Sequence, residues 1–257
     1  MGVLETIAPL TLILAFTIVL VAGVVKGAIG FAMPLIMVSG LGSLMDPKLA
    51  IAAILFPIVF SNLLQTFRQG YRPAIDALQD TWRYVLTVCI AIFIAAQWVP
   101  NIPTNIFYWI LGVPVVILSL LQLFGINFYI AEIHRRWTQW VAGVLSGALG
   151  GLAGTWGPVT VLYLLATKTP KAKQIIVQGV VYGAGSFTLF VAHLQSGILN
   201  RDTAPLSLAM LPIALIGMYL GFKIHDMLDQ ALFRKITLIV LVIAGLNLLR
   251  RGVILSV

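Results

Sequence analysis

Two short stretches of an otherwise apolar chain combine glycine with proline in a pattern that could bind a ligand. The first, GAIGFAMP, covers residues 27–34, and the second, GTWGP, covers residues 154–158. Glycine costs about 1 kcal/mol relative to alanine inside a helix, whereas proline fits the first turn of a new helix. Each stretch therefore predicts a broken helix whose second part begins at the proline. The free N–H groups at such a helix N-terminus bind anions.

The second stretch ends a dense run of glycines at 147, 150, 151, 154 and 157, and we expect the helix to break within this run. Spaced pairs such as Gly23 with Gly27 and Gly143 with Gly147 have a second interpretation, because small residues four apart let two membrane helices pack closely. Pro-kinked packing helices without a ligand remain the alternative at both stretches.

Several polar side chains lie near the two predicted breaks and must find partners, because lipid offers none. Hydrogen bonding between helices and contact with a substrate are both open interpretations. Lys26 is the only cation beside a break, and we expect it to snorkel to the cytoplasmic interface rather than bind an anion. The predicted substrate-binding residues are Gly27, Gly30, Met33, Pro34, Asn62, Gln65, Gly154, Thr155, Trp156, Gly157, Gln178, Tyr182 and Ser186.

The acidic residues exclude several kinds of chemistry. All of them map to loops or span ends: Glu5, Asp46, Asp76, Asp80, Glu132, Asp202, Asp226 and Asp229. No paired carboxylates, histidine pair or metal-ligand set lies on an apolar span, so we expect no enzyme, no metal and no cofactor. Cys89 is the single cysteine, which excludes a disulfide within one chain.

The composition identifies the elements that must position these residues as membrane helices. The chain is 60% hydrophobic and only 9% charged, with a mean hydropathy of +1.04, so it cannot coat a soluble surface of its size. The net charge of +8 predicts basic cytoplasmic loops rather than nucleic-acid binding. Apolar runs near the length of a membrane span cover 6–25, 48–67, 83–99, 104–124, 172–192, 204–222 and 234–250. We expect polar loops at 68–82, 125–136, 193–203 and 223–233.

A repeat divides the chain into two halves. VAGVVKGAIGF at 21–31 returns as VAGVLSGALGG at 141–151 with one constant spacing, and Pro34 and Pro158 continue the parallel loosely. We expect one integral membrane domain made of two membrane repeats, residues 1–130 and 131–257.

The distribution of lysine and arginine decides how the halves are oriented. If every broken segment crosses the membrane, each half has five spans, the second half is inverted, and 12 basic residues face the cytoplasm against 4 outside. If the broken segments are re-entrant, four spans per half make the halves parallel and the basic residues divide almost evenly. The charge bias favours an all-α polytopic membrane protein with two inverted repeats of about five transmembrane or broken helices each.

The quoted motifs resemble a known family. GLAGTWGPVTVLYLL at 151–165 and VVKGAIGFAMPLIMVSGLGSLMDPKLAIAAILF at 24–56 look like the two repeats of the TauE/SafE family of sulfite and organosulfonate exporters. The resemblance covers nearly the whole chain and implies a permease for small sulfur-containing or other organic anions. It also implies a multi-pass protein of the cell inner membrane, with a small anion and the lipid bilayer as partners and no nucleic acid. The first repeat departs from the family pattern at residues 30–34, where it is poorer in glycine.

The expected function is export of an anion such as sulfite or a sulfonate by alternating access. Because no carboxylate is placed to carry protons or sodium, we expect the anion gradient or the membrane potential to drive it, at about 2.3 kcal/mol per charge for each 100 mV. Uptake of a small anion by the same fold and a non-transport membrane assembly protein are the alternatives. The sequence leaves the identity of the anion, the transport direction, the exact number of crossings and the oligomeric state open.

Overall fold

A computed structural model of the chain describes residues 4, 7–68, 70–126, 130–154, 156–167, 169, 171–225, 227 and 229–255. Within these residues every regular element is helical, which confirms the predicted all-α membrane class. Five described helices are long and apolar enough to cross a membrane, namely α2 (Pro9–Ile29), α4 (Pro47–Phe67), α5 (Tyr71–Trp98), α9 (Lys171–Gln195) and α10 (Ala204–His225). Two further long helices are α6 (Thr104–Leu123) and α11 (Gln230–Ile254).

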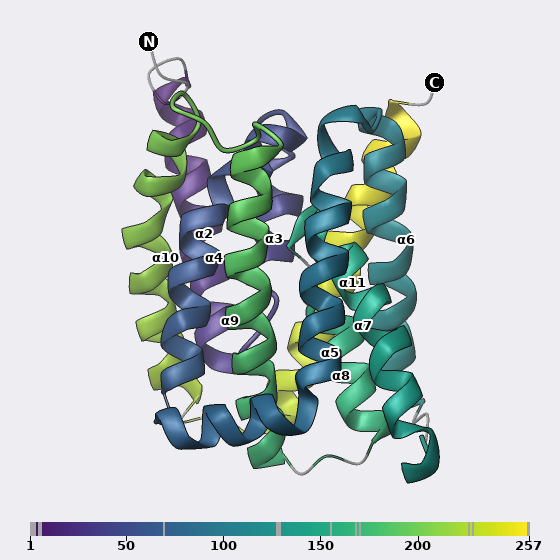
Figure 1. Ribbon diagram of the computed structural model, residues 1–257. Helices are drawn as coiled ribbons and strands as arrows, with labels where there is room; N and C mark the ends of the chain where they lie inside the picture. The colour runs from purple at the N-terminus through teal and green to yellow at the C-terminus, as the bar shows by residue number, and fades with distance from the viewer. Residues whose placement is uncertain are drawn as a thin grey trace.

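Two short helices follow the predicted breaks. The first is α3 (Met33–Leu41), after α2, and the second is α8 (Gly157–Ala166), after α7 (Arg135–Ala153). With nine and ten residues they are about 15 Å long, half the thickness of the hydrocarbon layer. Each one turns back toward the end of the bundle at which its preceding long helix began (Figure 1). The broken segments are therefore long helices followed by short returning helices.

The arrangement of the helices is compatible with two inverted repeats. Both ends of the chain lie at the same end of the bundle, and the connection between α6 and α7 lies at the opposite end (Figure 1). The contacts also match when the halves are exchanged, because α2 packs on α10 as α7 packs on α5. The helix pairs α4 with α9 and α6 with α11 each join one half to the other.

The glycines of α2 and α7 serve close helix packing. A Cβ atom added at Gly27 would lie 2.1 Å from the Met218 carbonyl oxygen of α10, and one added at Gly147 would lie 2.5 Å from the Val88 carbonyl oxygen of α5. For the same reason α7 remains helical through Gly150 and Gly151, so the break comes only at the end of the glycine run.

The constant spacing of the repeat does not extend to the breaks. The left-handed glycine that ends α2 is Gly30, whereas the one that ends α7 is Gly154 and not Gly150. Relative to the repeated motif, α7 has thus four additional residues, which is close to one helical turn. Because a whole turn is added, the faces of the two helices stay in register.

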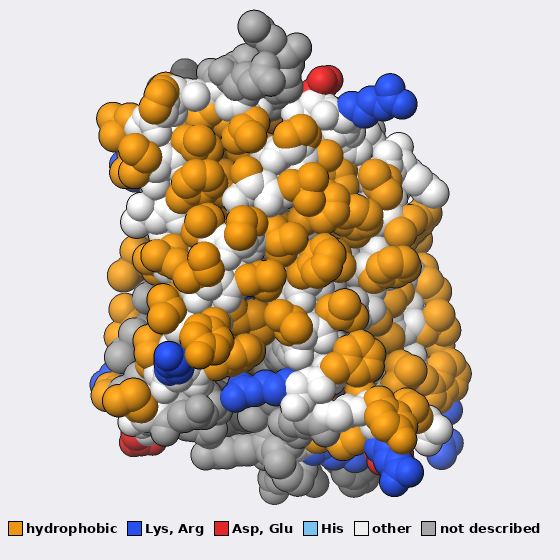
Figure 2. Space-filling view, turned by 90° about the vertical axis from the view of Figure 1, so that its left-hand side faces the viewer, with side chains coloured by type: hydrophobic (Ala, Val, Ile, Leu, Met, Phe, Trp, Pro, Cys, Tyr) orange, Lys and Arg blue, Asp and Glu red, His pale blue; other side chains and the backbone are white. Residues whose placement is uncertain are grey.

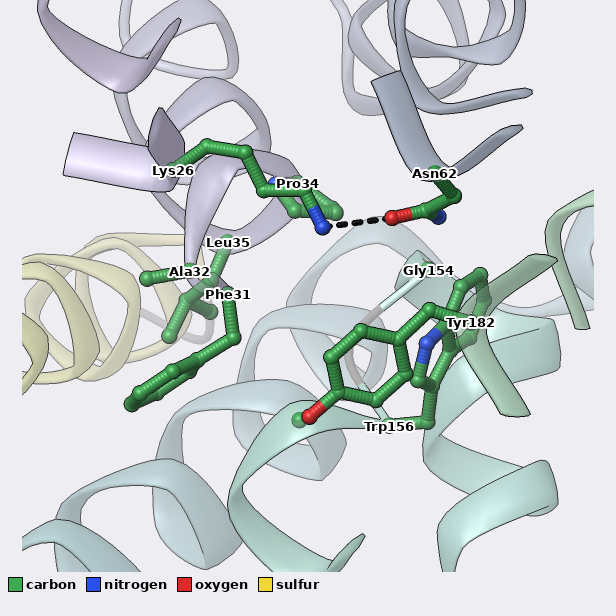
Figure 3. A pocket seen from close by; sticks show the side chains of 10 residues that line it. Lys26, Phe31, Ala32, Pro34, Leu35, Asn62, Gly154, Trp156 and Tyr182 are labelled. Carbon is green, nitrogen blue, oxygen red and sulfur yellow. Dashed lines mark hydrogen bonds between the residues drawn. The ribbon is translucent and has the colours of Figure 1, made fainter. Parts of the chain in front are cut away.

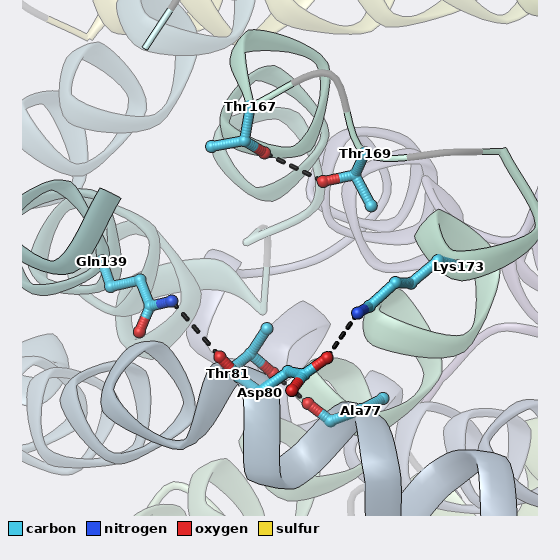
Figure 4. Close-up of polar contacts among 7 residues, drawn as sticks. All are labelled: Ala77, Asp80, Thr81, Gln139, Thr167, Thr169 and Lys173. Atoms are coloured by element: carbon cyan, nitrogen blue, oxygen red, sulfur yellow. Dashed lines mark hydrogen bonds and ion pairs between the residues drawn. The ribbon is translucent and has the colours of Figure 1, made fainter. Parts of the chain in front are cut away.

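The predicted loop at 68–82 is wrong over most of its length. Helix α5 begins at Tyr71, and its first part lies across the lower end of the bundle before the helix bends at Thr81, where φ is −121° and ψ is 18° (Figure 1). At this bend Asp80 forms an ion pair with Lys173 of α9, and the Asp80 carbonyl accepts a hydrogen bond from Gln139 of α7 (Figure 4). A polar sequence here forms a helix along the end of the bundle, because this segment does not have to cross lipid.

The surface matches a protein that spans a bilayer. A broad band of hydrophobic side chains surrounds the middle of the visible face, and most of the charged side chains on that face gather toward its two ends (Figure 2). Exposed apolar residues such as Leu10, Ile90 and Ile216 belong to the long helices and would contact lipid.

Candidate functional site

The first break is a turn of three residues between α2 and α3. Gly30 has a φ of +83° and Ala32 a φ of +77°, so both occupy the left-handed region that favours glycine. Helix α3 then begins at Met33, with Pro34 in its first turn. This confirms the predicted position of the proline, which lacks an N–H that the first turn would leave unpaired in any case.

The second break has the same plan with different residues. Gly154 ends α7 with a φ of +65°, and α8 begins at Gly157, directly before Pro158. Thr155 lies outside the described residues. Trp156 precedes α8, and its carbonyl accepts the Thr160 amide of the first helical turn at 3.1 Å. Both breaks therefore place the N-terminus of a short helix inside the bundle.

A pocket lies where the two breaks meet. A Cβ atom at Gly157 would lie 3.1 Å from the Phe31 ring, so the two turns are in close contact. The pocket is small, with a cavity volume of about 20 Å³. Its lining residues are Lys26, Phe31, Ala32, Pro34, Leu35, Asn62, Gly154, Trp156, Gly157 and Tyr182.

Lys26 supplies the positive charge of this pocket. Its side chain is only 2% exposed and donates hydrogen bonds to the Gly30 carbonyl at 3.0 Å, to Asn62 Oδ1 at 2.5 Å and to Gln65 Oε1 at 2.5 Å. The expectation that Lys26 snorkels to the interface is therefore wrong. The amide side chains of α4 offer it acceptors inside the bundle, so the ammonium need not reach water.

The pocket has one polar side and one aromatic side. Lys26 and Asn62 face each other on one side, and the rings of Trp156 and Tyr182 lie on the other (Figure 3). The Lys26 ammonium is 5.1 Å from the centre of the Tyr182 ring, within cation–π range. The Tyr182 hydroxyl and Gln65 Nε2 are buried and have no hydrogen-bond partner among the described residues, and Tyr182 is the one of these two residues that lines the pocket.

Hydroxyl groups, rather than a charge, surround the start of α8. Thr160 Oγ1 donates to the Trp156 carbonyl at 2.8 Å, and Ser146 Oγ donates to the same carbonyl at 3.1 Å. The Tyr84 hydroxyl donates to Thr160 Oγ1 at 3.0 Å. These groups satisfy one another, and Ser146 occupies the place in the repeated motif that Lys26 occupies in the first half.

The pocket includes some of the predicted substrate-binding residues and leaves others at its edge. Those that line it are Pro34, Asn62, Gly154, Trp156, Gly157 and Tyr182. Gln65 contacts the pocket through Lys26, and Gln178 Oε1 would lie 3.6 Å from a Cβ atom at Gly30. Gly27 packs on α10, Met33 is buried at the start of α3, and Ser186 donates back to the Gly183 carbonyl of its own helix.

Sequence reasoning missed Lys26, Phe31, Ala32 and Leu35 as parts of the pocket. For Lys26 a signal was present, because the repeat aligns it with Ser146 in the middle of a helix, about a turn before the break. Lys26 lies in the last turn of α2, but this helix end is inside the bundle and not at the membrane surface. Phe31, Ala32 and Leu35 are ordinary apolar residues, and only the fold identifies them.

Comparison with known proteins gives one match. The family model described as "Sulfite exporter TauE/SafE" matches residues 15–248, which is most of the chain. Searches of curated proteins and of solved structures found no match.

Proposed function

Because the chain belongs to the TauE/SafE sulfite exporter family, we propose that it carries small sulfur-containing or organic anions, such as sulfite or sulfonates, out of the cell. The family is one of multi-pass membrane transporters for anions and not of enzymes. The membrane in question is, in this proposal, the inner membrane of the cell. The pocket between the two breaks is the proposed binding site.

One observation carries this proposal: a buried ammonium lies in a pocket between two helix N-termini, and no carboxylate is among the described residues that line the pocket. A buried charge without a counter-charge favours an oppositely charged ligand. The N-termini of α3 and α8 add their partial positive charge to that of Lys26. A cation would be repelled by all three groups, so the pocket selects for an anion.

The fold supports alternating access as the mechanism. The pocket is built from both halves, because α2, α3 and α4 supply one part of its lining and the turn before α8 together with α9 supplies the other part. Rocking of one half against the other would expose such a site first to one side of the membrane and then to the other. The anion gradient and the membrane potential are sufficient driving forces in this proposal.

The proposal is tested by anion flux from liposomes that contain the purified protein and are loaded with sulfite or methanesulfonate. We expect Lys26→Met to lower the flux at least about 30-fold, since removal of a buried charge partner costs about 2–5 kcal/mol. Lys26→Arg keeps the charge and should retain measurable flux. Lys173→Met is the matched control, because the side chain of this lysine is partly exposed and does not line the pocket, and its loss should leave flux within about twofold of the wild type.

Normal flux in Lys26→Met, with the protein inserted in normal amounts, contradicts this binding site. Absence of flux for both anions in the wild-type protein contradicts the proposed transport function as a whole.

A further inference from the structure

We propose that the charge of Lys26 determines the step of the transport cycle on which the membrane potential acts. One bound monovalent anion neutralises Lys26, so the pocket reorients across the field without net charge when it is loaded. The potential acts instead on the return of the pocket without anion, which carries the ammonium charge. This inference rests on the proposed transport function and on the pocket as its binding site.

The hydrogen bonds of Lys26 favour its charged form. The nitrogen donates to three oxygen atoms at once, the Gly30 carbonyl, Asn62 Oδ1 and Gln65 Oε1. An ammonium has three N–H groups, whereas a neutral amine has only two and would need a donor in the third direction. Three acceptors around one lysine nitrogen are therefore the environment of the charged form.

No described group around the pocket cancels this charge. Helix α4 contributes the neutral amides Asn62 and Gln65, α9 contributes Tyr182, and the turns before α3 and α8 contribute apolar or aromatic side chains and glycine. The described carboxylates lie elsewhere, at the helix start Asp46, on the surface part of α5 at Asp76 and Asp80, and in the connections at Asp202 and Asp229. The formal charge of the pocket residues is therefore one positive unit.

The protein itself stabilises this charge inside the bundle. The three oxygen acceptors replace the hydration shell of the ammonium, and the Tyr182 ring lies 5.1 Å beneath it. An isolated buried charge would be prohibitively costly, but one that is fully hydrogen-bonded can remain buried. A carrier that returns with a positively charged pocket is therefore physically feasible for this chain.

The charge balance of a full cycle follows directly. The loaded pocket moves outward with no net charge, and the pocket without anion moves inward with one positive charge. The cycle as a whole moves one negative charge outward, so net export responds to the potential even though the anion-carrying step does not. An anion bound in a pocket without a charge would reverse this assignment and place the potential on the loaded step.

Two flux measurements separate these mechanisms. Liposomes containing the wild-type protein hold labelled methanesulfonate, a monoanion, with the potential clamped by potassium and valinomycin. For net efflux, about 100 mV should change the final anion ratio by roughly 50-fold, the equivalent of about 2.3 kcal/mol per charge. For one-to-one exchange, with methanesulfonate at equal concentration on both sides, the same potential should change the rate less than about twofold.

An exchange rate that changes more than about twofold under the same potential overturns this inference while leaving the proposed function intact. Absence of methanesulfonate flux contradicts the proposed function instead. The variant Lys26→Gln sharpens the test, because its residual exchange should become dependent on potential, whereas Lys26→Arg should behave like the wild type. If Lys26→Gln does not insert, the comparison of exchange with net efflux in the wild-type protein still decides the question.

Discussion

The two broken helices share a backbone plan but differ in their electrostatics. Each break has a left-handed glycine, Gly30 or Gly154, followed by a short helix with a proline at its start. At the first break a buried ammonium is held by amide oxygens, and at the second a group of neutral hydroxyls surrounds the Trp156 carbonyl. The shared backbone plan thus accounts for the shape of the site, while single side chains account for its charge.

The short helices are also held differently at their far ends. The carbonyl of Gly42, which caps α3, accepts hydrogen bonds from Arg251 of α11 and from the Tyr108 hydroxyl of α6. At α8 the corresponding carbonyl belongs to Ala166 and accepts the Ile130 amide at 2.8 Å. A cation at a helix C-terminus stabilises the helix dipole, so α3 has a charged group near each end and α8 has none among the described residues. The first half is therefore the charged half of the site.

The largest difference between the two breaks should appear in their stabilities. Asn62→Leu removes an acceptor of the buried ammonium and should lower the free energy of unfolding by about 1.5–3 kcal/mol, the range for hydrogen bonds to charged groups. Thr160→Val removes neutral hydrogen bonds at the second break and should cost only about 1 kcal/mol. Both values can be measured by unfolding of the purified proteins in mixed detergent micelles.

Asn62→Asp separates the fold from the charge of the site. The new carboxylate has nearly the same shape as the amide, so the protein should insert and remain stable, but it would neutralise Lys26. We expect anion flux to fall at least about tenfold, since an internal counter-ion competes with the substrate. Equal costs for Asn62→Leu and Thr160→Val, or full flux in Asn62→Asp, would mean that the charge at the first break has no special importance.

The sequence was sufficient to predict the two breaks, but not that Lys26 supplies the charge of the pocket between them. Glycine and proline act through the backbone of their own segment, so Gly154, Pro34 and the starts of α3 and α8 could be located from the sequence. The position of the Lys26 ammonium depends on acceptors that come from α4, about 36 residues further along the chain. Only the tertiary fold, which brings the Asn62 and Gln65 side chains of α4 to the end of α2, decides between the interface and the interior.

Two further features depend on tertiary contacts in the same way. The glycines of α7 remain helical because a close contact with α5 compensates their weak helix propensity, and that contact lies outside the segment. The polar stretch before Thr81 is helical because it lies along the end of the bundle, where its polar face stays hydrated. Local preferences were read correctly in both cases, and tertiary contacts reversed them.

The difference at the far ends of the short helices predicts a moderate effect. Arg251→Gln should raise the KM for anion flux about tenfold with little change in the maximal rate. The reason is that α3 loses a charged hydrogen bond worth about 1.5 kcal/mol, and the N-terminus of α3 lines the pocket. Arg251→Lys should recover part of this loss. Thr167→Val at the end of α8, where Thr167 donates only to the Tyr163 and Leu164 carbonyls, should leave the KM within about twofold. A lower maximal rate with an unchanged KM would show that Arg251 acts on movement rather than on the position of α3.

The smallest expected effect concerns the backbone of the first break. Ala32 has a φ of +77°, a conformation that costs an L-residue about 1–2 kcal/mol. Glycine adopts this φ freely, but its greater freedom in the unfolded chain lowers the stability of the folded state by about 0.5–1 kcal/mol. Ala32→Gly should therefore stabilise the protein by up to about 1 kcal/mol in the same micelle assay.

Gly154→Ala is the matched change at the second break and should have the opposite sign. Its φ of +65° strains any side chain, and the new methyl group would lie 3.1 Å from the Ile58 side chain.

Because Ala32 lines the pocket, flux measurements on Ala32→Gly add information that stability alone lacks. If the variant is more stable and transports more slowly, the strain at Ala32 lowers the barrier to movement of α3. A variant that is no more stable than the wild type would show that packing of the Ala32 methyl group offsets the strain.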